Sequence, residues 1–187
     1  MRKSILITLV TLLCLSACQN KPSKEEVRNY TFQILDLYYS CKTSAESINH
    51  DFKTYGEIAM QNETLKLDSL SFIEFETKYL KFLSSLSNEI EQMKQIEPIS
   101  NEHDFREDLI YYLTDLEDLY KNEGYDFMMI FKIGFYDSRE TIIEFQTRLK
   151  AHKKLFKKLK ASPNEFMHKY DFEDSEIYEI QEKYELQ

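Results

Sequence analysis

The sequence has few of the residues that bend or cross-link a chain. Its 187 residues include three glycines, three prolines, three cysteines and no tryptophan. Neither Asn-Gly nor Asp-Gly, the dipeptides typical of tight β-hairpins, occurs in it. So few turn signals argue against a β-rich fold, and we expect an almost entirely helical protein.

Motifs that would indicate an enzyme or a cofactor protein are also missing. The sequence contains no glycine-rich phosphate loop, no His-Glu-x-x-His metal motif and no Cys-x-x-Cys-His haem motif. No serine lies in the pattern of a nucleophile elbow. We therefore expect no catalytic residue, no metal site and no cofactor.

The first 18 residues have the pattern of a bacterial secretion signal. Two basic residues precede an apolar run over residues 5–15, which is shorter than the ~20 residues of a membrane-spanning helix. The run ends in Leu15-Ser16-Ala17-Cys18. This stretch resembles the lipobox of bacterial lipoproteins, which has an aliphatic residue, two small residues and an obligatory cysteine. An ordinary signal peptide is the alternative, but it would not require the cysteine.

The resemblance implies that cleavage falls before Cys18 and that the Cys18 sulfur receives a diacylglyceryl group. We expect residues 1–17 to be the signal peptide, residues 18–22 the lipidated cysteine and a short tether, and residues 23–187 a single domain. The implied location is the bacterial cell envelope, on the outer membrane in a Gram-negative cell. The short tether would keep the domain close to the membrane surface.

Without residues 1–17 the chain is strongly acidic and has one cysteine besides the anchor. The full sequence has 24 Lys and Arg against 33 Asp and Glu, and the signal takes two basic residues with it, so 22 against 33 leaves a net charge of −11. Such a charge does not favour nucleic acid as a partner. Cys41 has no partner for an internal disulfide, and we expect it to be a small buried hydrophobe.

Apolar residues recur at steps of three and four along four segments, which predicts four long amphipathic helices. Ser23 begins the first with a capping box, and Asp68 or Ser71 begins the second. The third is expected to open at about residue 100 and to reach Ile133 as one helix with an irregularity at Gly124. The expected inward positions of the first two helices are Tyr30, Ile34, Tyr38, Cys41, Ala45, Ile48, Phe52, Tyr55 and Ala59, then Phe72, Phe75, Tyr79, Phe82, Leu86, Ile90 and Met93.

The fourth helix is expected to begin after residue 137, and a short helical or irregular tail follows it. Joined by short polar turns, these segments predict an all-α fold, an antiparallel helical bundle of about four long helices plus a short C-terminal helical tail. We expect Phe52, Phe82, Leu116 and Phe145 in its core.

Two histidines are candidate ligand-binding residues. His152 lies on the inward side of the fourth helix, where we favour a hydrogen bond to a carboxylate or a tyrosine over a metal or haem. Glu165 and His168 have the Glu-x-x-His spacing of di-iron bundles. Such a site needs a second pair and further carboxylates, so we expect a solvated polar face instead.

Two charged surfaces are candidate partner sites. The fourth helix has a basic stretch without acids over residues 148–160, and acidic segments precede and follow it. We favour compensation of this stretch by neighbouring helices, the acidic tail among them, over a free basic patch. The third helix has an acidic face. The candidate residues are Asp104, Asp108, Asp115 and Asp118 on the acidic face, and Lys153, Lys154, Lys157 and Lys158 on the basic stretch.

Together these features predict a membrane-anchored envelope lipoprotein that works as a non-enzymatic binding or structural module. Two alternatives remain: an immunity or exclusion lipoprotein that neutralises a toxin or envelope partner, and a bundle that carries metal, haem or another ligand. The expected partners are the membrane, through Cys18, and a protein of the envelope.

The substitution Cys18→Ser tests the anchor. We expect an unprocessed or soluble product, because the thioether needs sulfur, whereas Cys41→Ser, the same change at the other cysteine of the mature chain, should leave lipidation intact. Membrane fractionation and incorporation of labelled fatty acid measure the difference. A Cys18→Ser product that is cut after Ala17, takes up label and stays with membranes would contradict the prediction.

Overall fold

The computed structural model describes residues 21–62, 65–100, 104–136, 138–159 and 162–184, without the side chains of residues 156–162. Within these residues the chain forms helices and no strand. None of the helices in this part combines the length and apolarity that crossing a membrane requires. Cys18, the predicted signal peptide over residues 1–17 and the side chains of Lys157 and Lys158 lie outside the described residues.

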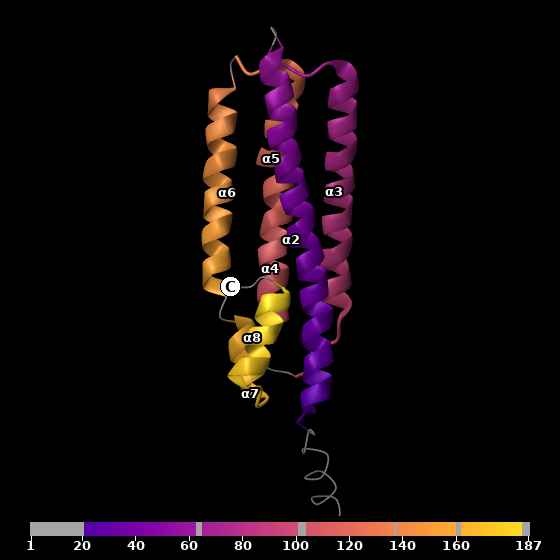
Figure 1. Cartoon of the computed structure of the whole chain (residues 1–187), viewed down its shortest axis with the longest axis vertical. Helices are drawn as coiled ribbons and strands as arrows, with labels where there is room; N and C mark the ends of the chain where they lie inside the picture. Colours follow the sequence, from indigo (N-terminus) through magenta and orange to yellow (C-terminus); the bar gives the residue numbers. More distant parts are fainter. Residues whose placement is uncertain (1–20, 63–64, 101–103, 137, 160–161, 185–187) are drawn as a thin grey trace, which may run out of the picture.

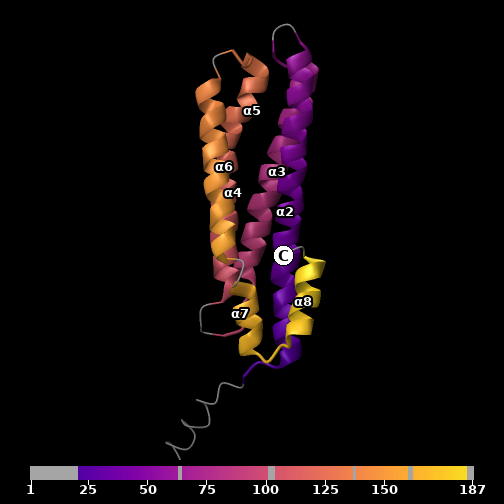
Figure 2. The same ribbon diagram turned by 60° about the vertical axis from the view of Figure 1, so that its left-hand side comes forward.

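The long helices form four antiparallel columns, which confirms the predicted helical bundle (Figure 1). α5 continues the direction of α4, so these two helices share one column. α7 and α8 fold back against the end of the bundle where α2 begins (Figure 2). The helices are α2 (Lys24–Gln61), α3 (Ser69–Gln95), α4 (Phe105–Lys121), α5 (Glu123–Ile133), α6 (Arg139–Leu159), α7 (Ser162–Lys169) and α8 (Asp174–Lys183).

α2 and α3 each present one continuous buried stripe. Every inward position predicted for them, over residues 30–59 and 72–93, is buried. Ser23 caps α2 in the predicted capping box, and Asp68 caps α3 by accepting two backbone hydrogen bonds. Side chains three and four positions apart share a helix face, so the sequence spacing alone was enough to locate both stripes.

Phe52 is at the centre of an aromatic core. Its ring centroid lies 5.0–6.0 Å from five other rings, which come from α3, α5 and α6. One side chain of α2 therefore contacts three other helices. The five rings are those of Phe75, Tyr79, Phe127, Phe131 and Phe145. Phe82, Leu116 and Phe145, the other predicted core residues, are buried as well.

The third helix, predicted as a single helix with an irregularity at Gly124, is instead divided into α4 and α5 at Asn122, which leaves the helical conformation. The Tyr79 hydroxyl donates to the Tyr120 carbonyl, which the Gly124 N–H would use in a continuous helix. A Cβ on Gly124 would lie 2.6 Å from the Tyr79 oxygen, so glycine allows α5 to approach α3. The break comes two residues before Gly124. α5 ends at Ile133, as predicted, and the Ile133 side chain is exposed.

α8 attaches the acidic tail to α2. Glu176 lies 2.5 Å from both Lys24 and Arg28, and the Tyr184 hydroxyl donates to Asp36 at 2.5 Å. α7 packs against α4. We expected the tail to compensate the basic stretch of α6, but its Glu176 pairs with the start of α2 instead.

The substitution Phe52→Ala tests the aromatic core. We expect the free energy of unfolding to fall by ~3–5 kcal/mol, because the change removes a ring that contacts three helices and leaves a cavity. Tyr111→Ala, the same kind of truncation at an exposed position of α4, should change it by less than ~0.5 kcal/mol. Urea denaturation followed by circular dichroism measures both. Equal losses in the two variants would contradict the central place of Phe52.

Candidate functional site

α6 packs closely on α4 and α5 but not on α2, which leaves one side of the bundle incompletely closed. Phe52 and Phe145 meet across this side, with ring centroids 5.6 Å apart. Next to that contact is a groove of about 210 Å³ between α2, α4 and α6. The groove is lined by Tyr38, Lys42, Ala45, Glu46 and Asn49 of α2, Tyr112, Leu113, Leu116 and Tyr120 of α4, and Leu149, His152 and Lys153 of α6.

A three-residue polar cluster forms one wall of the groove. Arg148 and His152 are four residues apart on α6 and therefore share a face. Arg148 donates two hydrogen bonds to Asp115 of α4, at 2.5 and 3.1 Å, one to each carboxylate oxygen. His152 Nδ1 lies 2.7 Å from the Asp115 oxygen that accepts the longer bond. The predicted bond from His152 to a carboxylate is thus confirmed.

Burial sets the charge state of this cluster. It lowers the pKa of His152, and the opposing effect of Asp115 does not cancel it, so the neutral imidazole is favoured. Burial alone would raise the pKa of Asp115, but the hydrogen bonds from Arg148 and His152 outweigh it and lower that pKa. The cluster is therefore an Asp115–Arg148 ion pair with a neutral histidine, whose Nδ1 proton is donated to Asp115.

His152 Nε2 is a buried polar atom without a hydrogen-bond partner among the described residues. The His152 residue is 2% exposed. Its ring stacks on Tyr112, with centroids 4.2 Å apart and planes 29° apart. His152 also lines the groove. In the neutral imidazole with its proton on Nδ1, Nε2 is a hydrogen-bond acceptor.

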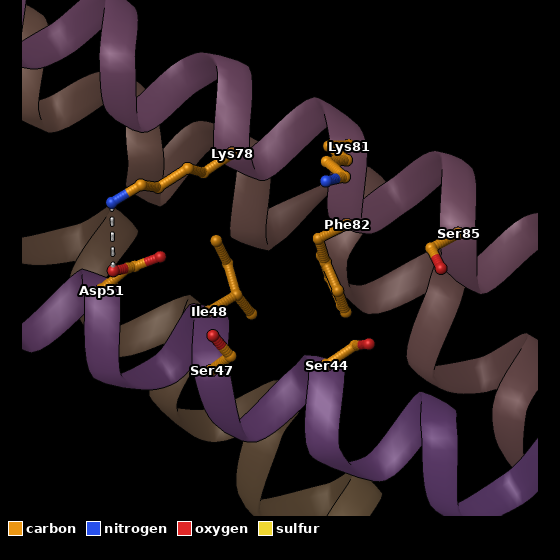
Figure 3. A pocket seen from close by; sticks show the side chains of 8 residues that line it. All are labelled: Ser44, Ser47, Ile48, Asp51, Lys78, Lys81, Phe82 and Ser85. Atoms are coloured by element: carbon orange, nitrogen blue, oxygen red, sulfur yellow. Dashed lines mark ion pairs between the residues drawn. The ribbon is translucent and has the colours of Figure 1, made fainter.

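Two other hollows have no comparable group. The hollow between α2 and α3 is more open, and in it Lys78 of α3 extends toward Asp51 of α2, at 3.8 Å (Figure 3). Ile48 and Phe82 separate this ion pair from Ser44 and Ser85 (Figure 3). A third, open hollow between α2 and α5 is lined mainly by apolar side chains, among them three phenylalanines of α5 and its following loop.

The predicted acidic face is divided between interior and surface. Asp104 is buried, where it caps α4 through the Arg106 N–H and accepts from the Tyr30 hydroxyl. Asp115 is bound to Arg148 and His152. Asp108 is half-buried, and Asp118 is exposed. The four therefore do not form one exposed surface, because the α4 face that carries them turns partly toward α2 and α6.

Lys153 and Lys154 of the basic stretch are exposed. Compensation of this stretch by a neighbouring helix is confirmed for Arg148, which pairs with Asp115 of α4. The side chains of Lys157 and Lys158 lie outside the described residues. Lys153 also lines the groove.

The other candidate residues belong to ordinary surfaces or to the core. Glu165 and His168 of α7 are exposed, and His168 lies 3.6 Å from Asp174. No group of three or more His, Cys, Asp or Glu side chains suited to a metal ion occurs in the described part of the chain. Cys41 is buried and donates to Glu89, and burial raises the pKa of its thiol.

The sequence indicated His152 as a candidate site residue, but it did not indicate which residues contact it. Arg148 was interpreted only as part of the basic stretch, and Tyr112 was not singled out. The four-residue spacing of Arg148 and His152 on an inward face was the available signal, since two basic groups one turn apart need a buried acid between them.

Comparison with known proteins finds no family model, no curated protein and no solved structure that matches this chain. The site is therefore interpreted from its own chemistry.

The substitution His152→Phe tests the charge state of the cluster. The unfolded chain takes up a proton on this histidine near pH 6.5, whereas the folded protein resists it, so stability falls as the pH drops below 6.5. We expect the variant to lose this part of the pH dependence, at most ~1.4 kcal/mol per pH unit. Above pH ~7 the two proteins should have parallel profiles.

Urea denaturation at several pH values between 7.5 and 5 measures this difference. His168→Phe, the same change at an exposed histidine, should keep the dependence of the wild type. Asp115 does not confuse the result, because the stability that its lowered pKa contributes is lost only near pH 4 and below. A His152→Phe protein with the wild-type profile would show that folding does not lower the pKa of His152.

Proposed function

We propose that the protein is a membrane-anchored lipoprotein of the bacterial envelope whose helical bundle is a non-enzymatic binding module. The binding site is the groove between α2, α4 and α6. The lipobox at Cys18 supports the anchor. α2 begins at Lys24, so only a few residues separate that cysteine from the bundle.

The observation that carries the proposal is the unpartnered Nε2 of His152 in the wall of the groove. A buried polar atom without a partner lowers the free energy of unfolding by ~1–3 kcal/mol. A histidine that served only to pack could be replaced by an apolar ring at no such cost. A ligand that supplies the missing hydrogen bond would account for the presence of His152 beside the groove.

The groove supports binding rather than turnover. Its lining side chains include no serine, threonine or cysteine that His152 could activate as a nucleophile. The Asp115 carboxylate is held by Arg148 and orients the imidazole. This arrangement presents a fixed hydrogen-bond acceptor, which is what a binding site needs.

A second candidate, a protein partner such as the toxin of an immunity lipoprotein, is favoured by a different surface. Large apolar side chains are exposed at the end of the bundle remote from the start of α2 (Figure 1). Exposed apolar groups gathered in one region often mark protein contacts. They are Met60, Leu70, Ile73, Ile133 and Tyr136.

Photo-crosslinking in the envelope tests the groove. A photoreactive amino acid at Lys153, on the rim, should give an adduct in the full lipidated protein. The same amino acid at Lys150, an exposed position of the same helix outside the groove, should give much less. Mass spectrometry of the purified protein measures both.

Filling the groove provides the matched control. Ala45→Leu adds three carbon atoms to its lining and should reduce the Lys153 adduct at least fivefold, whereas Ala151→Leu, on an exposed face of α6, should not. Equal labelling at Lys153 and Lys150, or labelling that Ala45→Leu leaves unchanged, would refute the groove as the binding site. A protein adduct formed from position 133 alone would favour the second candidate.

A further inference from the structure

The chemistry of the groove narrows the class of ligand. We propose that it binds a small uncharged molecule of one or two aromatic rings that carries an O–H or N–H group and donates a hydrogen bond to His152 Nε2. This inference rests on the proposed function of the groove as a binding site. The proposed occupant is a free small molecule.

The requirement for a donor follows from the hydrogen bonds of the cluster. Asp115 is held by two bonds from Arg148, and its oxygen 2.7 Å from Nδ1 fixes the proton on that nitrogen. Because burial lowers the pKa of His152 and favours the neutral imidazole, Nε2 then has a lone pair and no proton. A ligand carbonyl or ether oxygen would place a second lone pair against it. A hydroxyl or an N–H would make the bond that Nε2 lacks.

The rim gives no preference for a charged ligand. Lys42 and Glu46 lie on α2 and Lys153 lies on α6, so charges of both signs are present at the opening. Lys42 also lies over the Tyr39 ring, 5.7 Å from its centroid. A ligand of either charge would therefore meet a like charge as well as an opposite one.

The walls favour aromatic rings. Tyr38, Tyr112 and Tyr120 line the groove, and the Tyr120 hydroxyl already donates to Asn49 at 2.9 Å. Tyr112 and His152 form a flat stacked pair against which a planar molecule can pack. Between these rings the lining is aliphatic, from Leu113, Leu116 and Leu149.

The volume sets the size of the ligand. At about 210 Å³, the groove is smaller than the ~300–1,000 Å³ of sites for drug-sized molecules. This volume is suited to a compound of one or two rings.

Two pairs of probes test the proposal on the wild-type domain within the full chain. Indole and 1-methylindole differ in one N–H, and 2-naphthol and 2-methoxynaphthalene differ in one O–H. We expect each donor to bind about tenfold more tightly than its methylated partner, because one hydrogen bond to a buried acceptor is lost. Calorimetry measures affinity, and the ¹⁵N shift of His152 Nε2 reports the bond itself.

His152→Phe keeps a ring and removes the acceptor, so the preference for the donor of each pair should disappear. His168→Phe should keep it. Equal binding within the pairs by the wild-type protein, or no binding of indole and 2-naphthol at millimolar concentration, overturns the proposal. Neither result depends on the folding of a variant.

The outcome also separates the ligand class from the proposed function. A Lys153 adduct that is lost in Ala45→Leu, together with failure of both probe pairs, would mean that the groove binds something of different chemistry. Donor-dependent probe binding without any such adduct in cells would confirm the acceptor chemistry and refute the function.

Discussion

The burial of one apolar stripe along α2 is the constraint on which the arrangement of the other helices depends. That stripe runs the length of the 38-residue helix and is covered chiefly by α3, with smaller contributions from α4 and α5. α6 packs on α4 and α5 instead, and the Phe52–Phe145 contact brings one of its rings to α2. The groove forms because α2 and α6 each pack closely on other helices but not on one another.

The sequence predicted well those parts of the fold that depend on local spacing. The inward residues of α2 and α3 could be assigned one by one, because both helices keep a regular step of three and four over their whole length. The break at Asn122 could not be predicted in the same way. It depends on the hydroxyl of Tyr79, which is 41 positions before the carbonyl that it reaches. The same holds for α8, whose Glu176 meets Lys24 from the other end of the chain.

The site shows the same division between local and distant information. The inward position of His152 follows from the helical period, and so does the need for a polar partner. Which carboxylate it meets depends on the side-by-side placement of α4 and α6. Asp115 had been grouped with Asp104 and Asp118 as one acidic face, since they recur along one helix. Packing gives the three carboxylates different environments. Asp104 is a buried helix cap, Asp115 is bound to Arg148 and His152, and Asp118 is exposed to solvent.

The contacts between α8 and α2 have a mechanical consequence if Cys18 is the point of attachment. The C-terminal helix lies beside the first turns of α2, where a pull on the anchor would enter the bundle. Force along the axis of α2 would load the Glu176 ion pairs and the Tyr184–Asp36 hydrogen bond at the same time. These contacts would then have to break together rather than one after another. With an anchor at Cys18, α8 would thus reinforce the end of the bundle that bears the load.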